Sequence, residues 1–269
     1  MEDRPRPLKH GYARAMTIAL GILASDGIVI AADSEISAGE YMSVEGQKVT
    51  AMTHFTNEPD QPHGNIVMAG SGDAGYLEAI YPEVTRLFKD ALDLDAFYEE
   101  LQKYILEFYD DHVIPFSGER PHFSLIVGTK RGDDMRLWTT LRNRVIPCRG
   151  HFTAIGSGEM YATGILQRIC GSQCADVSKL LAAYVIYQVK DRIPGCGKDT
   201  HVVSIKLNKL IPSGFGPRAC AALERLFMDY GQIEAAIIHK VFGSTELGDW
   251  QGLPNDLETL KQAIAKAVS

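Results

Sequence analysis

Short apolar runs and longer amphipathic runs follow one another along the chain. The apolar segments 17–24 and 28–33 flank a Ser-Asp-Gly turn, and because they are apolar at nearly every position they predict a buried β-hairpin. Similar short runs predict strands at 48–52, 65–70, 123–128, 135–140, 153–155 and 200–207. Apolar residues at helical spacing predict helices near 77–91, 93–113, 156–169, 176–190, 218–240 and 256–268.

The order of these elements predicts the fold class. Strands, a pair of helices, strands and a second pair of helices do not give the regular alternation of a doubly wound sheet. The order fits an α+β, four-layer α-β-β-α sandwich of two antiparallel sheets flanked by helix pairs. We expect one domain over 17–210, with a C-terminal helical extension, 211–269, packed on it. Residues 1–16 have no periodic apolar pattern and form a propeptide, a tail or a stretch upstream of the true start.

Composition narrows the class of protein. Of 269 residues, 45% are hydrophobic and 23% charged, which excludes disorder for most of the chain. A net charge of −7 argues against a general nucleic-acid binder. The longest apolar runs fall short of a membrane span, and residues 1–16 lack the apolar region of a secretion signal. Five cysteines without a CxxC pair or a zinc-type cluster predict a cytoplasmic protein without a structural metal.

One motif suggests a nucleotide and is rejected on its context. Residues 70–75 read GSGDAG and match the pattern GxGxxG, which binds dinucleotides when a second strand follows within about 30 residues. Here the next 40 or so residues have helical periodicity, so the segment predicts a tight turn between a strand and a helix.

Three residues carry candidate chemistry. Thr17 begins the first strand, Asp33 ends the second, and Lys48 opens a third β-like segment. Each alone has an ordinary structural explanation. Together they resemble the β-type subunits of the proteasome family of N-terminal nucleophile hydrolases. The resemblance extends in order over roughly residues 17–207, through the segments 17–22, 26–33, 46–49, 68–74, 154–164 and 190–191.

The resemblance implies a role for each of these three residues. Thr17 matches the nucleophile, whose own α-amino group serves as the base once it is the N-terminal residue. A hydroxyl needs such a base near neutral pH, and a free α-amine, with a pKa of about 7.7–8.0, can provide it. Lys48 matches the lysine that lowers the amine's pKa and stabilises negative charge. Asp33 matches the carboxylate that orients this lysine.

Further positions follow from the same resemblance. Gly70 matches the glycine whose N–H binds the tetrahedral oxyanion and contacts substrate. Ser157 and Asp191 match the polar pair that holds the threonine's amine and hydroxyl. Met68 lies where the family lines its first specificity pocket, and Ser37 is a second substrate-binding candidate.

Two departures from the family pattern leave alternatives open. Pro194 stands where a serine is expected, and Cys196 interrupts a Gly-Gly pair, so one hydroxyl near the nucleophile is missing. Met16 precedes Thr17 in place of the usual glycine, so the amine is exposed by autoprocessing or by a start at Met16. A chain in which it stays blocked would be a catalytically silent structural subunit. An amidase or acyltransferase of small amides uses the same nucleophile.

The expected function is therefore a threonine-type hydrolase that cleaves peptide bonds in a self-compartmentalising homo-oligomeric ring or stack. Its substrates would be peptides or unfolded proteins, and an ATP-dependent unfoldase is a compatible partner. We expect no nucleic acid, no membrane, no metal and no organic cofactor.

Overall fold

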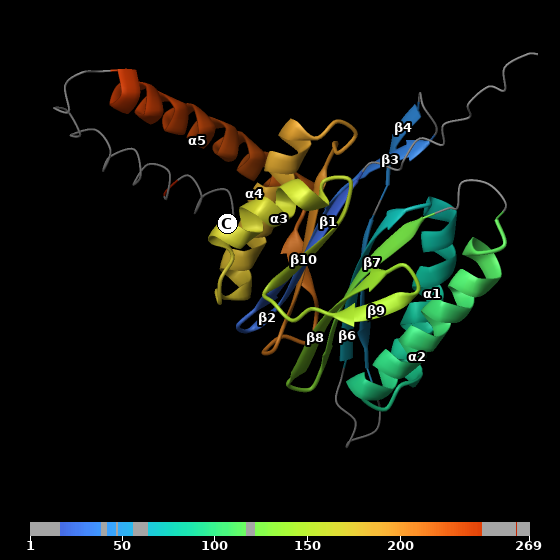
Figure 1. The fold of residues 1–269 in the computed structure, drawn as a ribbon. Coiled ribbons are helices and arrows are strands. Elements are labelled where there is room, and N and C mark those ends of the chain that lie inside the picture. The colour runs from blue at the N-terminus through green and yellow to red at the C-terminus, as the bar shows by residue number, and fades with distance from the viewer. Residues whose placement is uncertain are drawn as a thin grey trace, which may run out of the picture.

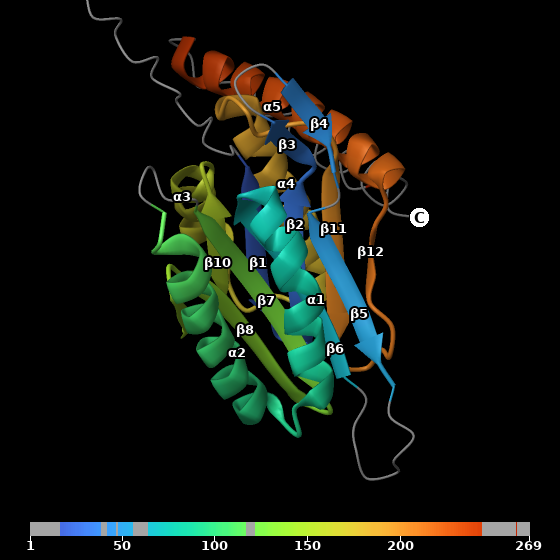
Figure 2. The same ribbon diagram turned by 90° about the vertical axis from the view of Figure 1, so that its right-hand side faces the viewer.

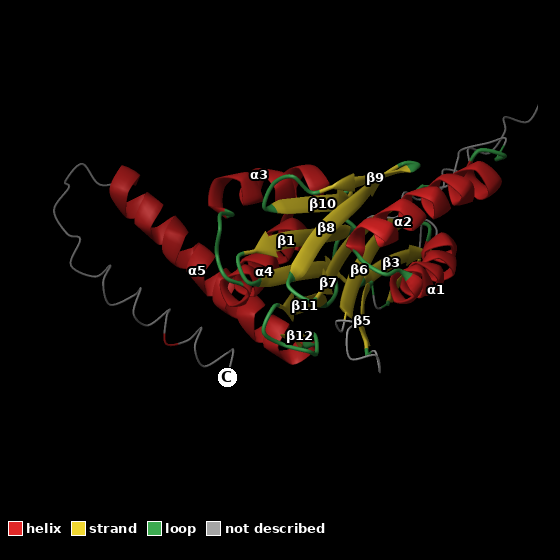
Figure 3. Ribbon diagram, turned by 90° about the horizontal axis from the view of Figure 1, so that it is seen from below, coloured by secondary structure: helices red, strands yellow, loops and turns green. Residues whose placement is uncertain are grey.

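The computed structural model describes residues 17–38, 42–46, 48–55, 64–116, 122–243 and 262. Two five-stranded antiparallel sheets lie between two groups of helices (Figures 1 and 3). The first sheet has the order β10-β1-β2-β11-β12 and the second the order β5-β6-β7-β8-β9. This confirms the predicted α+β, four-layer α-β-β-α sandwich. The predicted helix at 256–268 and the segment 1–16 fall outside the described residues, apart from Gln262.

The bounds of the elements are as follows. The strands of the first sheet are β1 (Ile18–Ala24), β2 (Gly27–Asp33), β10 (Phe152–Gly156), β11 (Thr200–Lys206) and β12 (Ser213–Phe215). Those of the second are β5 (Val49–His54), β6 (Gly64–Gly72), β7 (Phe123–Arg131), β8 (Asp134–Leu141) and β9 (Arg144–Pro147). A separate hairpin consists of β3 (Glu35–Ala38) and β4 (Met42–Glu45). The helices are α1 (Ala74–Asp90), α2 (Leu94–Phe108), the π-helix η1 (Tyr109–Val113), α3 (Glu159–Ile169), α4 (Ala175–Arg192) and α5 (Pro217–Gly243).

The β1–β2 hairpin is buried on both faces, as its continuous apolar pattern predicts. Alternate residues of β1 and β2 point in opposite directions. Leu20 and Val29 pack in the core beneath α3 and α4, whereas Ile28 and Ile30 face the second sheet. Side chains of both sheets thus share the central core.

Glycines let the two sheets approach each other closely. A Cβ atom on Gly128 of β7 would lie 2.8 Å from the side chain of Ile28 across the core.

The outer layers are built from amphipathic helices: α1 and α2 cover the second sheet, and α3, α4 and the first half of α5 cover the first (Figures 1 and 2). Within the described ranges, none of the helices combines the length and hydrophobicity that a membrane span requires.

The GxGxxG segment forms a turn between β6 and α1. Gly72 has a φ of +111°, and a Cβ there would lie 2.0 Å from a backbone oxygen, so only glycine fits. Asp73 then caps α1 by accepting the N–H of Tyr76 (3.2 Å). Because of this cap the helix starts at Ala74 and contains Pro82, earlier than the apolar spacing predicts.

Candidate functional site

Strand order brings four separated segments of the chain to one end of the first sheet. Thr17 immediately precedes β1, and Asp33 ends the neighbouring antiparallel strand β2. Ser157 follows β10 on the other side of β1, and Gly197 lies in the turn before β11. An antiparallel strand begins where its neighbours end, so these four residues meet by topology. Lys48 reaches the same place from the second sheet, just before β5.

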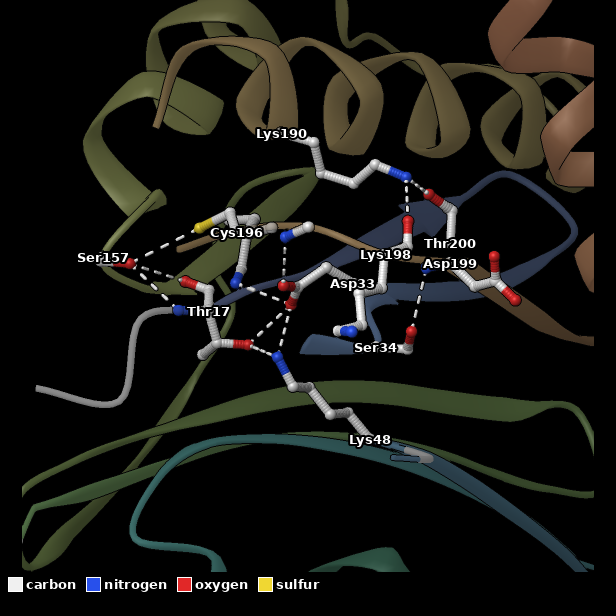
Figure 4. A network of polar contacts seen from close by, with 12 residues as sticks. Thr17, Asp33, Ser34, Lys48, Ser157, Lys190, Cys196, Lys198, Asp199 and Thr200 are labelled. Atoms are coloured by element: carbon white, nitrogen blue, oxygen red, sulfur yellow. Dashed lines mark hydrogen bonds and ion pairs between the residues drawn. The ribbon is translucent and has the colours of Figure 1, made fainter. Parts of the chain in front are cut away.

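Thr17, Asp33 and Lys48 form one buried polar cluster (Figure 4). The hydroxyl of Thr17 donates to Asp33 Oδ1 at 2.7 Å, and Lys48 Nζ donates to the same oxygen at 2.7 Å. Lys48 Nζ also donates to Thr17 Oγ1. Exposed fractions are 3% for Thr17, 0% for Asp33 and 8% for Lys48. A hydroxyl thus touches an amine and a carboxylate at once, away from bulk water.

The Asp33 carboxylate is held by four donors. Oδ1 accepts from the Thr17 hydroxyl, from Lys48 and from the backbone N–H of Ile18 at 3.1 Å. Oδ2 accepts the backbone N–H of Gly197 at 3.0 Å. A fully buried carboxylate needs such partners to remain charged. Asp33 can therefore orient both the Thr17 hydroxyl and the Lys48 amine.

Burial changes the acid–base properties of Lys48. Removal from water lowers the pKa of Lys48 below its usual value, and the charge and hydrogen bond of Asp33 oppose this effect. A lysine with a lowered pKa gives up its proton more readily than one in water. Its Nζ, in contact with Thr17 Oγ1, can therefore exchange a proton with the hydroxyl as well as stabilise negative charge there.

The backbone of Thr17 is fixed by the turn after β10. The N–H of Thr17 donates to Ser157 Oγ at 3.1 Å, and the Ser157 hydroxyl contacts the Thr17 carbonyl oxygen at 3.2 Å. Gly156 has a φ of +100°, and a Cβ there would lie 2.3 Å from that same oxygen. Only glycine therefore allows the turn to lie this close to the predicted nucleophile.

The turn between α4 and β11 contributes a residue that the sequence pattern missed. Cys196 is buried, and its Sγ lies 3.6 Å from Ser157 Oγ, whereas Pro194 is exposed. From the sequence, Cys196 was noted only because it interrupts the expected Gly-Gly pair. In the structure it, rather than position 194, lies beside Ser157. Burial raises the pKa of the Cys196 thiol to about 11, so it is protonated and serves as a neutral neighbour.

Asp191 is not part of this cluster in the structure, which differs from the expected pairing with Ser157. Its half-exposed carboxylate forms an ion pair with Arg192 at 3.0 Å. The reason is helix geometry. Val189 faces the core, and two residues later the helix has turned by about 200°, which points position 191 to solvent. Gly197 N–H and Cys196 occupy the neighbourhood in which Asp191 was expected.

The remaining predicted positions lie on β6 and β3. The β5–β6 register places Gly70 next to Lys48, and a Cβ on Gly70 would lie 2.5 Å from the side chain of Leu77. Met68 is 1% exposed and packs in the core between the second sheet and α1 and α2, so it does not line an open pocket here. Ser37 pairs with Ser43 in the β3–β4 hairpin, and its side chain lies outside the described part.

Acidic, histidine and cysteine side chains do not gather into a metal-binding group anywhere in the described ranges. The site consists instead of one hydroxyl, one amine, one carboxylate and the Ser157 hydroxyl. This set can hold a nucleophilic oxygen and stabilise negative charge on it, and the activation of that oxygen still needs a base.

Comparison with known proteins identifies the fold. Neither the protein-family models nor the curated proteins contain a match to this chain. Among solved structures, Anbu (ancestral beta-subunit) from Yersinia bercovieri is 15% identical with a TM-score of 0.66, covering 82% of this chain and 97% of its own. Anbu from Hyphomicrobium sp. strain MC1 is 15% identical with a TM-score of 0.62, over 87% and 100% of the two chains. The helical assembly of the Anbu complex from Pseudomonas aeruginosa is 17% identical with a TM-score of 0.64, over 87% and 100%.

These similarities correct the family assignment made from the sequence. The chain resembles Anbu proteins, which are related to proteasome subunits but distinct from them, so the assignment to the proteasome β-type subunit family is wrong. At 15–17% identity the likeness shows the fold alone.

Proposed function

We propose that the chain is an Anbu-like, threonine-type N-terminal nucleophile hydrolase that cleaves peptide bonds, with Thr17 as its nucleophile. The observation that carries the proposal is the triple contact of Thr17 Oγ1, Lys48 Nζ and Asp33 Oδ1. Its components lie at the ends of strands of two different sheets, and burial excludes water from all three. A structural Thr-Asp contact alone would not require a buried lysine on the same hydroxyl.

The mechanism requires that Thr17 become the N-terminal residue. In the full sequence its nitrogen is a peptide nitrogen, whose lone pair is delocalised into the carbonyl group and cannot serve as a base. Cleavage between Met16 and Thr17, or removal of an initiating Met16, would create an α-amine at the position where the Thr17 nitrogen now contacts Ser157 Oγ. That amine would accept the Oγ1 proton while Lys48 stabilises the charge that develops on oxygen. Asp33 would hold Lys48 throughout.

The expected substrates are peptides or unfolded proteins, processed inside a homo-oligomer. The Anbu complex from Pseudomonas aeruginosa is described as a helical assembly. By analogy we propose that this chain also assembles with copies of itself, in the cytoplasm, and that 17–210 forms the catalytic domain. An ATP-dependent unfoldase that feeds the assembly belongs to the same proposal.

A silent structural subunit is the second candidate, and one observation favours it. Sixteen residues precede Thr17, so the unprocessed chain lacks the amine on which the mechanism depends. The two candidates differ in the mass of the mature protein, because only the enzyme must begin at Thr17.

The first test combines intact mass with covalent labelling. Protein expressed from Met1 and from Met16 is weighed, then treated with a peptide vinyl sulfone, which forms a stable ether with an N-terminal threonine. We expect a species that begins at Thr17, labelled once at that residue and active on fluorogenic peptides. Thr17→Ala should abolish labelling and cleavage, and Thr17→Ser should retain part of both. A Thr17 that stays internal in both forms would establish the silent subunit instead.

A further inference from the structure

A half-buried ion pair joins the last two described helices behind the site. Lys190, near the end of α4, places its Nζ 2.6 Å from Glu224 Oε1 in α5. The two side chains are 11% and 24% exposed. Neither residue belongs to the predicted catalytic set, and a surface pair would not need to be this enclosed.

The same lysine holds the turn that leads into β11 (Figure 4). Lys190 Nζ donates to the carbonyl oxygen of Lys198 at 2.6 Å and to Thr200 Oγ1 at 3.0 Å. The Thr200 hydroxyl in turn donates to Glu224 at 2.5 Å. Lys198 has a φ of +59°, a left-handed backbone conformation that residues other than glycine rarely adopt. The ammonium of Lys190 thus fastens the most strained residue of the turn.

The other side of this turn faces the catalytic cluster. Gly197 donates its N–H to Asp33 Oδ2 at 3.0 Å, one residue before the strained Lys198. Asp199 and Ser34 exchange two further hydrogen bonds, at 2.9 and 3.0 Å. The turn is therefore held between the α4–α5 pair behind it and the end of β2 in front. A change in the conformation of the turn must therefore shift the Gly197 N–H that donates to Asp33.

We propose that Lys190 and Glu224 are positioning residues for the catalytic carboxylate. Their ion pair fixes the carbonyl of Lys198, which presents the N–H of Gly197 to Asp33 and so keeps Asp33 oriented toward Thr17 and the lysine opposite it. The proposal rests on the proposed function for its catalytic consequence. The mechanical part, a turn fixed by the ion pair, stands independently of it.

A second ion pair on the same helix provides a matched control. Lys206, at the end of β11, places its Nζ 2.7 Å from Asp176 at the start of α4. Its side chain is 9% exposed, close to the value for Lys190. Breaking this pair weakens the contact between α4 and β11 at the end remote from Thr17. Lys206→Met therefore reproduces a general loss of helix–sheet attachment without touching the turn.

The first measurement is hydrogen–deuterium exchange of the full chain. Lys190→Met and Glu224→Gln should raise the exchange rate of peptides spanning 195–200 by about tenfold. The first change removes the donor to the Lys198 carbonyl oxygen, and the second removes the charge that holds this donor in place. Lys206→Met should leave those peptides unchanged. Equal exchange at 195–200 in wild type and both variants would overturn the proposal, as would an equal rise in all three variants.

The second measurement is the kinetics of the processed enzyme. Lys190→Met should lower kcat about tenfold with little change in KM, because orientation of Asp33 matters after the substrate has bound. Lys190→Arg, which retains charge and donors, should recover part of the loss. An unchanged kcat together with faster exchange would show that the turn does not govern Asp33 and would overturn the positioning role. If wild type itself neither cleaves nor is labelled, the hydrolase proposal fails, and the exchange result alone decides the role of the ion pair.

Discussion

The buried ion pair between Lys48 and Asp33 should show strong energetic coupling. Lys48→Met removes the ammonium but keeps the length of the side chain. The fully buried Asp33 carboxyl group then keeps only the Thr17 hydroxyl and the N–H groups of Ile18 and Gly197 as donors. Removing one member of a buried pair costs about 3–5 kcal/mol, and the three surviving donors place this case at about 3 kcal/mol.

The double variant should recover most of that loss. Asp33→Asn alone leaves the Lys48 ammonium buried without a counter-charge and should also cost about 3 kcal/mol. Combining Asp33→Asn with Lys48→Met removes both charges, while the amide oxygen still accepts N–H groups. We expect the pair of changes to lie within about 1 kcal/mol of wild type, far from the sum of the single costs.

Urea unfolding of the four proteins at pH 7 measures this cycle. Each single variant should lower the free energy of unfolding by about 3 kcal/mol. In a thermal melt this loss corresponds to a decrease in Tm of about 6–12 °C, since 1 kcal/mol corresponds to about 2–4 °C in a domain of this size. Single variants within about 0.5 kcal/mol of wild type, or a double variant equal to the sum of the singles, would refute the reasoning.

The pH dependence of the Asp33→Asn variant supplies a check on sign. Burial lowers the pKa of Lys48, and loss of Asp33 removes the charge that opposes this effect. Between the lowered folded pKa and the unfolded value of about 10.4, the unfolded chain binds more protons, so stability rises with pH. The cost of Asp33→Asn should therefore shrink as pH increases toward 10, and a cost that grows with pH would contradict the assigned cause.

Three further predictions concern the surroundings of the site. Gly156→Ala should destabilise the fold by more than about 2 kcal/mol, because the new Cβ would lie 2.3 Å from the carbonyl oxygen of Thr17. Gly164→Ala, whose Cβ would have no atom within 4 Å, should be neutral or stabilising, and thermal unfolding of both variants measures the difference. Iodoacetamide at pH 8 should modify exposed Cys174 well before Cys196, whose thiol has a pKa of about 11, as peptide mapping by mass spectrometry would show. Hydrogen bonds from Lys206 and Lys179 lower the pKa of Asp176 to about 2. The ionised Asp176 should therefore stabilise the fold above pH 4 or so, by about 1 kcal/mol at most at this exposed site. Asp176→Asn should be less stable than wild type by that amount above pH 4 or so, and the difference should vanish in acid unfolding as the pH falls through 2.

The fold was predictable where packing and local pattern agree. The β1–β2 hairpin is apolar on both faces because both faces are covered, so the sequence carries the signal directly. The β3–β4 hairpin, in contrast, consists of two strands of only four residues each in a mainly polar stretch and forms a sheet of its own. The alternation of apolar and polar residues in each strand is therefore too short to stand out from a loop. The start of α1 was misplaced because the Asp73 cap, rather than the first apolar residue, determines where the helix begins.

The candidate site was predictable to the extent that its residues are fixed by strand ends. Thr17, Asp33, Lys48 and Ser157 each lie directly beside a strand, and antiparallel pairing brings them together whatever the loops do. Asp191 instead lies at the end of a helix, where the facing of a side chain depends on the helix phase. Spacing along the sequence does not record that phase.

The α4–β11 turn shows why a missing group in a motif does not by itself imply an inactive site. In the sequence, Pro194 stands where the motif has a serine, which suggests that a hydroxyl is missing from the site. In three dimensions the turn supplies other groups instead, the Cys196 thiol against Ser157 and the N–H of Gly197 against Asp33. The donor to Asp33 is a backbone group, which any residue other than proline provides, so only the conformation of the turn must be maintained. That conformation depends on Lys190 through the carbonyl of Lys198. The geometry of the site thus depends on the Lys190–Glu224 ion pair rather than on a side chain within the motif. Because this ion pair lies outside the motif, comparison of motifs does not reveal it.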